Sequence, residues 1–540
     1  MWSVPWSQTN QQVILKPGFI AWNVRKNSVK KALSPKEEKM VPRYANDKIT
    51  EIFSDINKLN MWQKVELAVI LASENLGIFP QGIFEKIKTI FDVHPINEEV
   101  IKWWKARDKE ITHDLNAFID ERVRHLPTGL HQYSHKGMTS YDTEEPAFAL
   151  LLKAAVIELD RPYQIIKGNL MAMSEKYRYT PMLGRSHGQE AKIQTFGKRC
   201  ETWLKSFLIA YNEMLGAYKL LSQSKLSGAI GNYQGLTPAQ EAKALEILGL
   251  KPFKGATQIM PRVIYLPLAN SLEMIVITLT QIAEDIRLGA RSGLPIFQEP
   301  FGKKQKGSSA MPHKKNTITC EQQVGMLTMA RNFAQMLRER AITWEERAIE
   351  QSCVERVAWP DLFHVVMQSF KNMIKVLSGL QVFPDNMMIE IKNSRGCYAS
   401  EDAKDWLKEH GAEFELPHED AYRIVQLAAF NAHKVSLFRQ NLRQGKIESY
   451  VQAEEVFAKL REQVAHVNSY DHSYDHLAVI IANGSLNYSD ELDLSEDEVS
   501  KWNEILRKIF TVKKNVESFK NIFSITYQLR GEDELFKKYE

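Results

Sequence analysis

The sequence has few cysteines and no long apolar run, and each shortage excludes a class of protein. Only four cysteines occur in 540 residues, and their wide separation does not fit a structural zinc site. Free thiols in a reducing cytosol are therefore expected, with no metal. No run of 18 apolar residues occurs, so a membrane span is not expected. The four cysteines are Cys200, Cys320, Cys353 and Cys397.

Net charge is also low, at +4, and no basic stripe with interleaved aromatic residues is present. Nucleic acid is therefore not an expected partner. A hydrophobic content of 44% and a charged content of 25% are typical of a soluble globular protein. The chain is longer than a single core usually supports, so two or three domains are expected.

Alternation of period two is missing between residues 150 and 350, where apolar residues follow a heptad pattern. This pattern predicts long helices packed nearly parallel in a bundle, and residues 150–350 are therefore expected to be all-α, without strands. The second heptad stretch is apolar on further faces, which burial within one bundle or association of several subunits would cover. The two stretches are Phe196, Cys200, Trp203, Phe207, Ala210, Met214 and Ala217, and Leu268, Leu272, Ile275, Leu279, Ile282 and Ile286.

We divide the chain into an extension (1–42), an N-terminal helical domain (43–146), a central long-helix bundle (147–379) and a C-terminal helical domain (380–540). The order of apolar and basic residues in 1–42 does not fit a secretory signal. A loop is expected at 131–146. Helices are expected at 48–59, 62–74, 97–125, 148–177, 317–343, 401–410, 418–441 and 496–519.

A glycine- and lysine-rich stretch, Gly307–Asn316, interrupts the helical pattern and predicts a loop. It ends beside a predicted helix start, where unpaired N–H groups and the helix dipole favour an anion. Lys314 and Asn316 would stand at this anion site, and Ser308 would lie on the loop. A lysine-rich surface loop without a function is the alternative.

The spacing Gly-Ser-x-x-Met-x-x-Lys-x-Asn over these ten residues resembles the signature of the fumarase/aspartase superfamily, whose members split a C–N or C–O bond and release fumarate. Further blocks of residues 42–440 agree in order, and they are most similar to the purine-nucleotide branch. These blocks contain Arg43 and Tyr44, His113 and Asp114, Thr139 and Ser140, Ser186 and His187, and Arg347, Ser352 and Arg356.

The resemblance implies an all-α fold of three helical domains, whose central bundle assembles into the twenty-helix core of a cytoplasmic homotetramer with shared active sites. It implies elimination of fumarate from adenylosuccinate, giving AMP, and from the succinylaminoimidazole carboxamide ribotide, giving AICAR. No cofactor is implied, because side chains would move the proton and hold the charge.

Within that resemblance Ser308 is the base and His187 the acid, while His113 binds or polarises the same region. The chemistry fits these residue types, because the intermediate carries two negative charges on one carboxylate that Lys314 and Asn316 can meet. A leaving amine needs a proton donor, and histidine suits neutral pH. The remaining block residues would bind substrate, with a phosphate held by Arg43, Tyr44, Arg347, Ser352 and Arg356.

Several alternatives remain open at this point. His187 could be an ordinary loop histidine, His113 could lie on the solvated face of a charged helix, and the arginines could pair with Glu345, Glu346 and Glu355. The whole chain could be a lyase of the argininosuccinate or carboxymuconate cycloisomerase type, or a helical scaffold with a decayed site. Departures from the family pattern, which affect substrate contacts, are Val263, Thr317, Gln351, Cys353 and Asn232.

Overall fold

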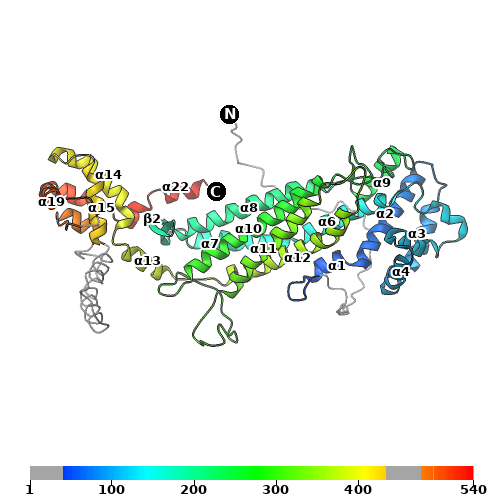
Figure 1. Cartoon of the computed structure of the whole chain (residues 1–540), viewed down its shortest axis with the longest axis horizontal. Coiled ribbons are helices and arrows are strands. Elements are labelled where there is room, and N and C mark those ends of the chain that lie inside the picture. Colours follow the sequence, from blue (N-terminus) through cyan, green and yellow to red (C-terminus); the bar gives the residue numbers. More distant parts are fainter. Residues whose placement is uncertain (1–39, 433–475, 490–491, 539–540) are drawn as a thin grey trace. The chain divides into compact units, whose positions relative to one another are not determined.

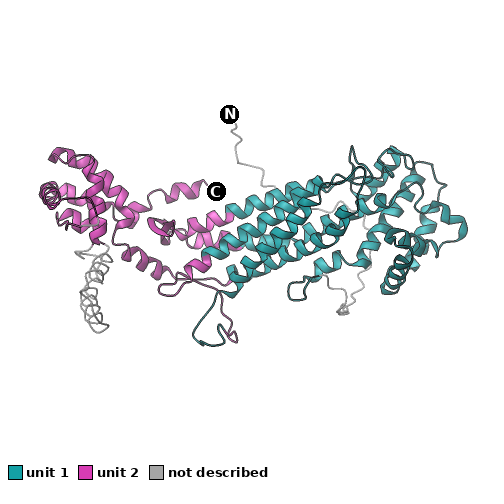
Figure 2. Cartoon of the chain, in the orientation of Figure 1, with its two compact units in different colours: residues 1–168, 205–285, 307–378 teal, residues 169–204, 286–306, 379–540 magenta. Residues whose placement is uncertain are grey.

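The computed structural model describes residues 40–432, 476–489 and 492–538, which form two compact units (Figures 1 and 2). Unit 1 takes its described residues from the stretches up to 168, 205–285 and 307–378. Unit 2 takes them from 169–204, 286–306 and 379 onward. The domains predicted from the sequence are continuous stretches, whereas each of these units combines several separate stretches of the chain. The domain boundaries therefore stay a prediction. Residues 1–39 and 433–441, which were assigned to the extension and to the end of a helix, lie outside the described residues.

Helices dominate both units. The first half of the chain contains α1 (Asp47–Ile52), α2 (Asp55–Asn75), α3 (Ile83–Val93), α4 (Glu98–Ile111), α5 (Asp114–Val123), α6 (Ser140–Glu158), α7 (Asp160–Lys176), α8 (Phe196–Leu220) and α9 (Pro238–Leu248). The second half contains α10 (Leu266–Gly289), α11 (Ile318–Glu339), α12 (Glu350–Ser378), α13 (Pro384–Asn393), α14 (Ser400–Gly411), α15 (Asp420–Ala432), α18 (Leu477–Ala482), α19 (Glu496–Ile509), α20 (Lys513–Asn521), α21 (Ile525–Gln528) and α22 (Glu532–Lys537).

Long helices of unit 1 form the bundle that the heptad pattern predicts. Helices α6, α8, α10, α11 and α12 run side by side, and α11 packs along α12 (Figure 1). The heptad positions Leu268, Leu272, Ile275, Leu279 and Ile282 of α10 are each at most 1% exposed. A second core of unit 1 joins α2, α4, α5, α6 and α9 around Trp62 and Phe118. The all-α fold class is therefore confirmed.

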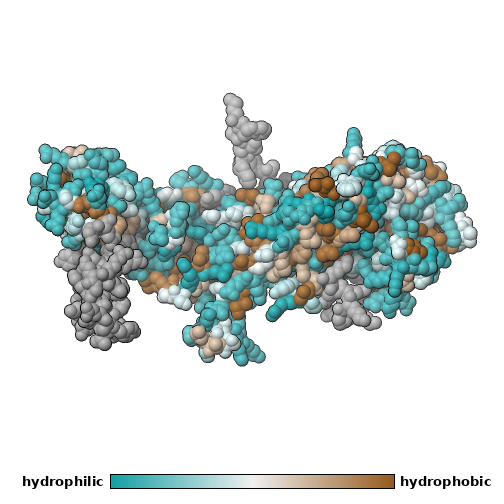
Figure 3. Space-filling view, in the orientation of Figure 1, coloured by the Kyte–Doolittle hydropathy of each residue, from teal (hydrophilic) through white to brown (hydrophobic). Residues whose placement is uncertain are grey.

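By length and composition one helix among the described residues, Arg262–Gly289, could cross a membrane, although half of its most apolar window is buried. The sequence showed no such segment because Asn270, Ser271 and Glu273 interrupt the apolar run. The burial of the α10 heptad positions accounts for its apolar character, because a helix covered on several sides must be apolar on several sides. The face of the molecule in Figure 3 is mainly hydrophilic, with hydrophobic residues scattered over it.

Several local predictions are wrong. The helix predicted at 48–59 is interrupted between α1 and α2, and the one predicted at 496–519 is divided into α19 and α20. A hairpin of β1 (Pro181–Ser186) and β2 (Gln189–Thr195) lies in a region predicted to lack strands. The helix predicted at 97–125 is two helices, because Thr112 adopts a left-handed φ of 53° and ends α4. Residues 140–146, predicted as loop, begin α6, because Thr139 and Asp142 form a capping box that starts the helix.

The remaining regular segments are short. They are the strands β3 (Gln223–Ser224), β4 (Lys251–Pro252), β5 (Phe297–Gln298) and β6 (Gln381–Val382), and the 3-10 turns η1 (Thr128–Tyr133), η2 (Arg262–Tyr265), η3 (Cys397–Ala399) and η4 (Ala412–Phe414).

Candidate active site

His113 is the N-cap of α5, and not a residue inside a charged helix as one alternative had it. Its Nδ1 accepts a hydrogen bond from the Asn116 N–H at 3.2 Å. A neutral imidazole whose Nδ1 accepts must carry its proton on Nε2. Nε2 lies 3.4 Å from Ser140 Oγ, at the start of α6. The structure thus brings together two predicted site residues that are 27 positions apart, with Nε2 available as a donor.

Asp114, the first residue of α5, binds Arg356 of α12. The carboxylate accepts a hydrogen bond from Arg356 Nη2 at 2.8 Å through Oδ2 and one from the Leu115 N–H at 2.9 Å through Oδ1. The Arg356 side chain is still 56% exposed. Its guanidinium is therefore held by one acid while part of its donor fork remains open to a ligand.

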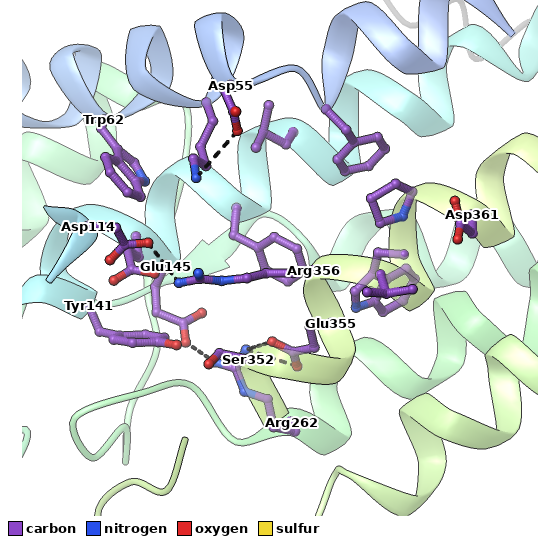
Figure 4. A pocket seen from close by; sticks show the side chains of 18 residues that line it. Asp55, Trp62, Asp114, Tyr141, Glu145, Arg262, Ser352, Glu355, Arg356 and Asp361 are labelled. Carbon is purple, nitrogen blue, oxygen red and sulfur yellow. Dashed lines mark hydrogen bonds and ion pairs between the residues drawn. The ribbon is translucent and has the colours of Figure 1, made fainter. Parts of the chain in front are cut away.

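This ion pair borders a cavity of about 540 Å³ in unit 1 (Figure 4). Aromatic rings of Phe53, Trp62, Phe148 and Trp359 line much of it. The polar groups labelled in Figure 4 come from α2, α5, α6, η2 and α12, and Asp114 points toward Arg356. A largely apolar cavity with a few charged groups has the character of a small-molecule site. Its polar lining residues are Asp55, Lys58, Asp114, Tyr141, Glu144, Glu145, Arg262, Ser352, Glu355, Arg356 and Asp361.

Glu144 lines the same cavity and was not among the predicted residues. Burial, and to a smaller extent the nearby Asp114, raise the pKa of its carboxyl to about 7, although Arg356 opposes the shift. The group therefore changes charge near neutral pH. No sequence signal pointed to it, because residues 140–146 were predicted as a loop, and only the start of α6 at Ser140 places Glu144 one turn after Ser140 on the same helix face.

Arg347 lies in the irregular segment before α12. Its Nη1 donates to Gln258 Oε1 at 3.1 Å, and its guanidinium lies 4.1 Å from the centroid of the Tyr141 ring. Ser352 is in the first turn of α12, lines the cavity, and donates from Oγ to the Ile349 carbonyl at 2.9 Å. An arginine and a hydroxyl at a helix start are suited to an anion.

The arginines do not make the ion pairs that the sequence offered as an alternative. Arg356 pairs with Asp114, whereas Glu355 lies 3.3 Å from Arg262. Gln258 was missed because a single glutamine in a loop carries no periodic signal. Its contact with Arg347 spans 89 residues of sequence, which no local pattern reveals.

Arg43 and Tyr44 form a turn before α1, in which the Tyr44 N–H donates to the Val41 carbonyl at 2.9 Å. Asn46 fixes this turn to α12, because its N–H donates to Nδ1 of the buried His364 at 3.0 Å. Burial lowers the pKa of His364 to about 4, so it is a neutral acceptor at physiological pH. Arg43 is exposed and Tyr44 is half-buried.

The signature segment Gly307–Asn316 is a loop, and it ends just before α11, whose N-cap is Thr317. A Cβ at Gly307 would collide with the Lys314 carbonyl oxygen, so only glycine fits. Asn316 Nδ2 closes the loop by donating to the Gly307 carbonyl at 2.9 Å. The loop and adjacent helix start that the sequence predicted are both present.

Ser308 accepts two backbone hydrogen bonds at its Oγ, from the Met311 N–H at 3.0 Å and from the Ala310 N–H at 3.3 Å. Two donors on one hydroxyl oxygen favour its negative form. Lys314 is exposed on the same loop. The segment therefore presents a hydroxyl oxygen held by two backbone donors and an exposed lysine side chain.

His187 belongs to unit 2, where it is the first residue of the two-residue turn joining β1 and β2. Both turn residues have positive φ, 52° at His187 and 77° at Gly188, as a type I′ hairpin turn requires. The turn presents the imidazole at an exposed hairpin tip, directly after Ser186. Leu183 and Ile193 anchor the hairpin in the core of unit 2.

The departures from the family pattern lie in different surroundings. Gln351 is buried in α12, whereas Val263 is 61% exposed and Asn232 and Cys353 are also exposed. Thr317 caps α11 without a side-chain hydrogen bond.

Comparison with known proteins identifies the family of the chain. A family described as Lyase matches residues 43–332. Curated adenylosuccinate lyases of Synechocystis sp. and Thermotoga maritima are 34% and 31% identical to the chain over 397 and 441 residues. These alignments cover 73% and 81% of this chain and 89% and 98% of the relatives.

Solved structures share the fold. A fumarate lyase from Mesorhizobium sp. BNC1 is 20% identical, with a TM-score of 0.65 over 90% of this chain and 99% of that one. A 3-carboxy-cis,cis-muconate lactonizing enzyme from Pseudomonas putida has the same TM-score at 18% identity, over 89% of this chain and 98% of that one. With the family match and the near full-length relatives, the chain belongs to the lyase family of the fumarase/aspartase superfamily that includes these adenylosuccinate lyases.

Proposed function

We propose that the protein is an adenylosuccinate lyase that eliminates fumarate from adenylosuccinate to give AMP. The observation that carries the proposal is the similarity to curated adenylosuccinate lyases at 30–34% identity over 72–81% of this chain. The same site would release fumarate from the succinylaminoimidazole carboxamide ribotide, giving AICAR, because both substrates carry a succinyl-amine and a 5′-phosphate.

The reaction divides into a proton removal and a C–N cleavage. Ser308 Oγ would take the proton from the succinyl carbon next to the carbon that bears nitrogen, leaving the electron pair delocalised into the adjacent carboxylate. The pair then forms the C=C bond of fumarate as the C–N bond breaks, and His187 would give a proton to the departing amine. The two backbone donors to Ser308 Oγ support its role as base.

Negative charge develops on the carboxylate in the intermediate. Fixed cations lower the energy of this intermediate most when water is excluded from the site. Lys314 and Asn316 would meet this charge. Both stand on the loop that carries Ser308, so a closure of the loop over substrate would deliver base and cation together. The loop's exposed position supports such a movement.

The nucleotide would occupy the part of the site that unit 1 assembles. Arg356 and Ser352 at the cavity, with Arg347 beside Gln258, would bind the phosphate together with Arg43 and Tyr44. Asp114, Thr139 and Ser140 would hold the remaining polar groups of substrate, and His113 would donate from Nε2 in the same region.

A homotetramer with shared sites in the cytosol would complete the arrangement. The unit 1 parts of the long helices α7, α8 and α10 expose apolar side chains, with Ile165 40%, Ile209 60% and Ile277 37% exposed. Large exposed apolar residues on neighbouring long helices support association between copies of the chain. Such an assembly would let His187 of one chain serve the Ser308 of another.

Purified protein incubated with adenylosuccinate tests the proposal by absorbance, with fumarate measured in parallel by a fumarase-coupled assay. Equal amounts of AMP and fumarate are expected. Argininosuccinate and carboxymuconate substrates are the matched alternatives, and turnover of one of these instead would replace the proposal. Absence of turnover on all of them would favour a helical scaffold with a decayed site.

A further inference from the structure

Lys225, which follows β3, is a buried cation with a full set of acceptors. Its side chain is 0% exposed, as is that of Asp142, whose Oδ1 lies 2.7 Å from Nζ. Nζ also donates to the carbonyls of Gly228 and Gln258, each at 2.9 Å. The three N–H groups of the ammonium therefore have three acceptors, which is what a buried charge requires.

One side of this cluster fixes the start of α6. Asp142 Oδ2 accepts from the Thr139 N–H at 2.9 Å, and its Oδ1 also accepts from the Gly228 N–H at 3.2 Å. Thr139 and Ser140 are therefore attached to Lys225 through a single carboxylate. Ser140 in turn lies against His113.

The other side fixes the residue that contacts Arg347. Lys225 holds the main-chain carbonyl of Gln258, and the side chain of Gln258 accepts from Arg347 Nη1. The preceding residue adds a second link, because Thr257 Oγ1 donates to the Glu346 carbonyl at 2.8 Å. The segment around Arg347 has no regular secondary structure, so these two contacts, together with the Tyr141 ring, define where its guanidinium lies.

We propose that Lys225 is a positioning residue that couples the Thr139–Ser140 helix start to the Gln258–Arg347 contact. It touches no proposed reacting group itself. Its three acceptors come from α6, the Gly228 turn and the Gln258 loop. One ammonium group therefore fixes the distance between the two sets of proposed substrate contacts, Thr139–Ser140 and Gln258–Arg347. The inference rests on the proposed function, because the groups it positions are those assigned there to substrate.

A purely structural lysine and a positioning lysine differ in which kinetic constant they change. Loss of alignment among nucleotide contacts weakens substrate binding, whereas partial unfolding lowers the active fraction and leaves KM unchanged. Lys225→Met is expected to raise KM for adenylosuccinate about 10- to 100-fold, with kcat within about fivefold of wild type. It also leaves the carboxylate of Asp142 buried without its cation, so the melting temperature should fall.

The double variant Lys225→Met/Asp142→Asn separates the two effects. Replacing the carboxylate by an amide removes the unpaired buried charge, so the melting temperature should recover while KM stays high. Arg122→Met is the matched control, because Arg122 is 2% exposed beside the buried Glu121 in the same unit but outside the proposed site. It should lower the melting temperature with KM unchanged.

Thr257→Val is a third test variant, and this substitution removes no buried charge. It deletes only the hydroxyl that binds the Glu346 carbonyl, and a several-fold rise in KM at a nearly unchanged melting temperature is expected. The positioning role would be overturned if Thr257→Val had the wild-type KM. It would also be overturned if the KM of the double variant returned to the wild-type value as its melting temperature recovered. A wild-type protein without turnover of adenylosuccinate would overturn the proposed function and the positioning role together.

Discussion

Arg356 of α12 donates to Asp114 at the start of α5 across 2.8 Å, joining segments 242 residues apart in the sequence. The carboxylate orients the guanidinium at the edge of the cavity, and more than half of the arginine side chain stays exposed. A pre-oriented arginine loses less conformational freedom when it binds a phosphate than a free one does. The ion pair with Asp114 thus explains how the exposed Arg356 side chain could bind a phosphate in one defined orientation.

Arg356→Ala should chiefly weaken substrate affinity. Removing one charge-assisted contact costs about 1.5–3 kcal/mol, or roughly a 10- to 150-fold rise in KM, with kcat little changed. Arg107→Ala is the matched control, because Arg107 also binds a carboxylate, that of Asp120 at 2.8 Å, but does not line this cavity. Steady-state kinetics of both variants provide the measurement. A fall in kcat at unchanged KM would contradict a phosphate-binding role for Arg356.

Ser308→Ala should nearly abolish turnover while substrate still binds. General-base catalysis contributes about 10²- to 10⁴-fold, and the substitution removes the group that would take the proton. Calorimetric titration of the variant with adenylosuccinate measures binding without turnover. Ser309→Ala changes an exposed neighbour on the same loop and serves as the control. Unchanged turnover in Ser308→Ala would refute the assignment of the base.

The sequence predicted the bundle well because heptad spacing is a local signal that burial enforces. Leu268 to Ile282 occupy the core of unit 1 as that spacing requires. It also predicted the loop at Gly307 and the helix start after it. The helix break at Thr112 escaped detection, because one residue in a left-handed conformation interrupts an otherwise continuous charged pattern.

The contacts inside the site could not be predicted, because they join distant segments. The hairpin at His187 was missed because its turn lacks the usual Asn-Gly pair, whereas His-Gly supplies the same two positive φ angles. Lys225 and Gln258 looked like ordinary residues of a polar stretch. Their importance depends on burial and on contacts with Asp142, Arg347 and each other, which join positions at least 33 apart and are not revealed by single-sequence patterns.

Glu144→Gln should change how stability depends on pH. The folded protein holds the carboxyl protonated up to its pKa of about 7, whereas the unfolded chain ionises near 4.5. Between these values the unfolded state binds fewer protons, so the wild-type free energy of unfolding should fall as pH rises from about 4.5 to 7. Below that window both states are protonated, and this contribution to the pH dependence vanishes.

The amide introduced by this substitution mimics the neutral carboxyl, so Glu144→Gln should lack the fall in stability. Relative to their difference at pH 4, the variant should gain about 3.5 kcal/mol over wild type above pH 7, because the two pKa values differ by about 2.5 units and each unit corresponds to about 1.4 kcal/mol. Urea unfolding at several pH values between about 4 and 8 measures the difference. Parallel stability curves for the two proteins would show that Glu144 does not titrate in this window.

Mixing two inactive variants should restore activity if the sites are shared between chains. His187→Gln lacks the proposed acid but keeps Ser308, and Ser308→Ala lacks the base but keeps His187. In randomly mixed oligomers, a site that takes Ser308 and His187 from different chains is intact in about one case in four, because each chain supplies the needed residue with a probability of about one half.

Both variants are therefore purified alone, mixed in equal amounts, dissociated in dilute denaturant and reassembled. Recovery of roughly a quarter of wild-type turnover is expected from the mixture, and none from either variant carried through the same treatment by itself. If Ser308 and His187 of one site came from the same chain, every site in the mixture would lack one of the two groups. Turnover would then stay at background however thoroughly the chains exchanged, and the proposed sharing of sites would be wrong.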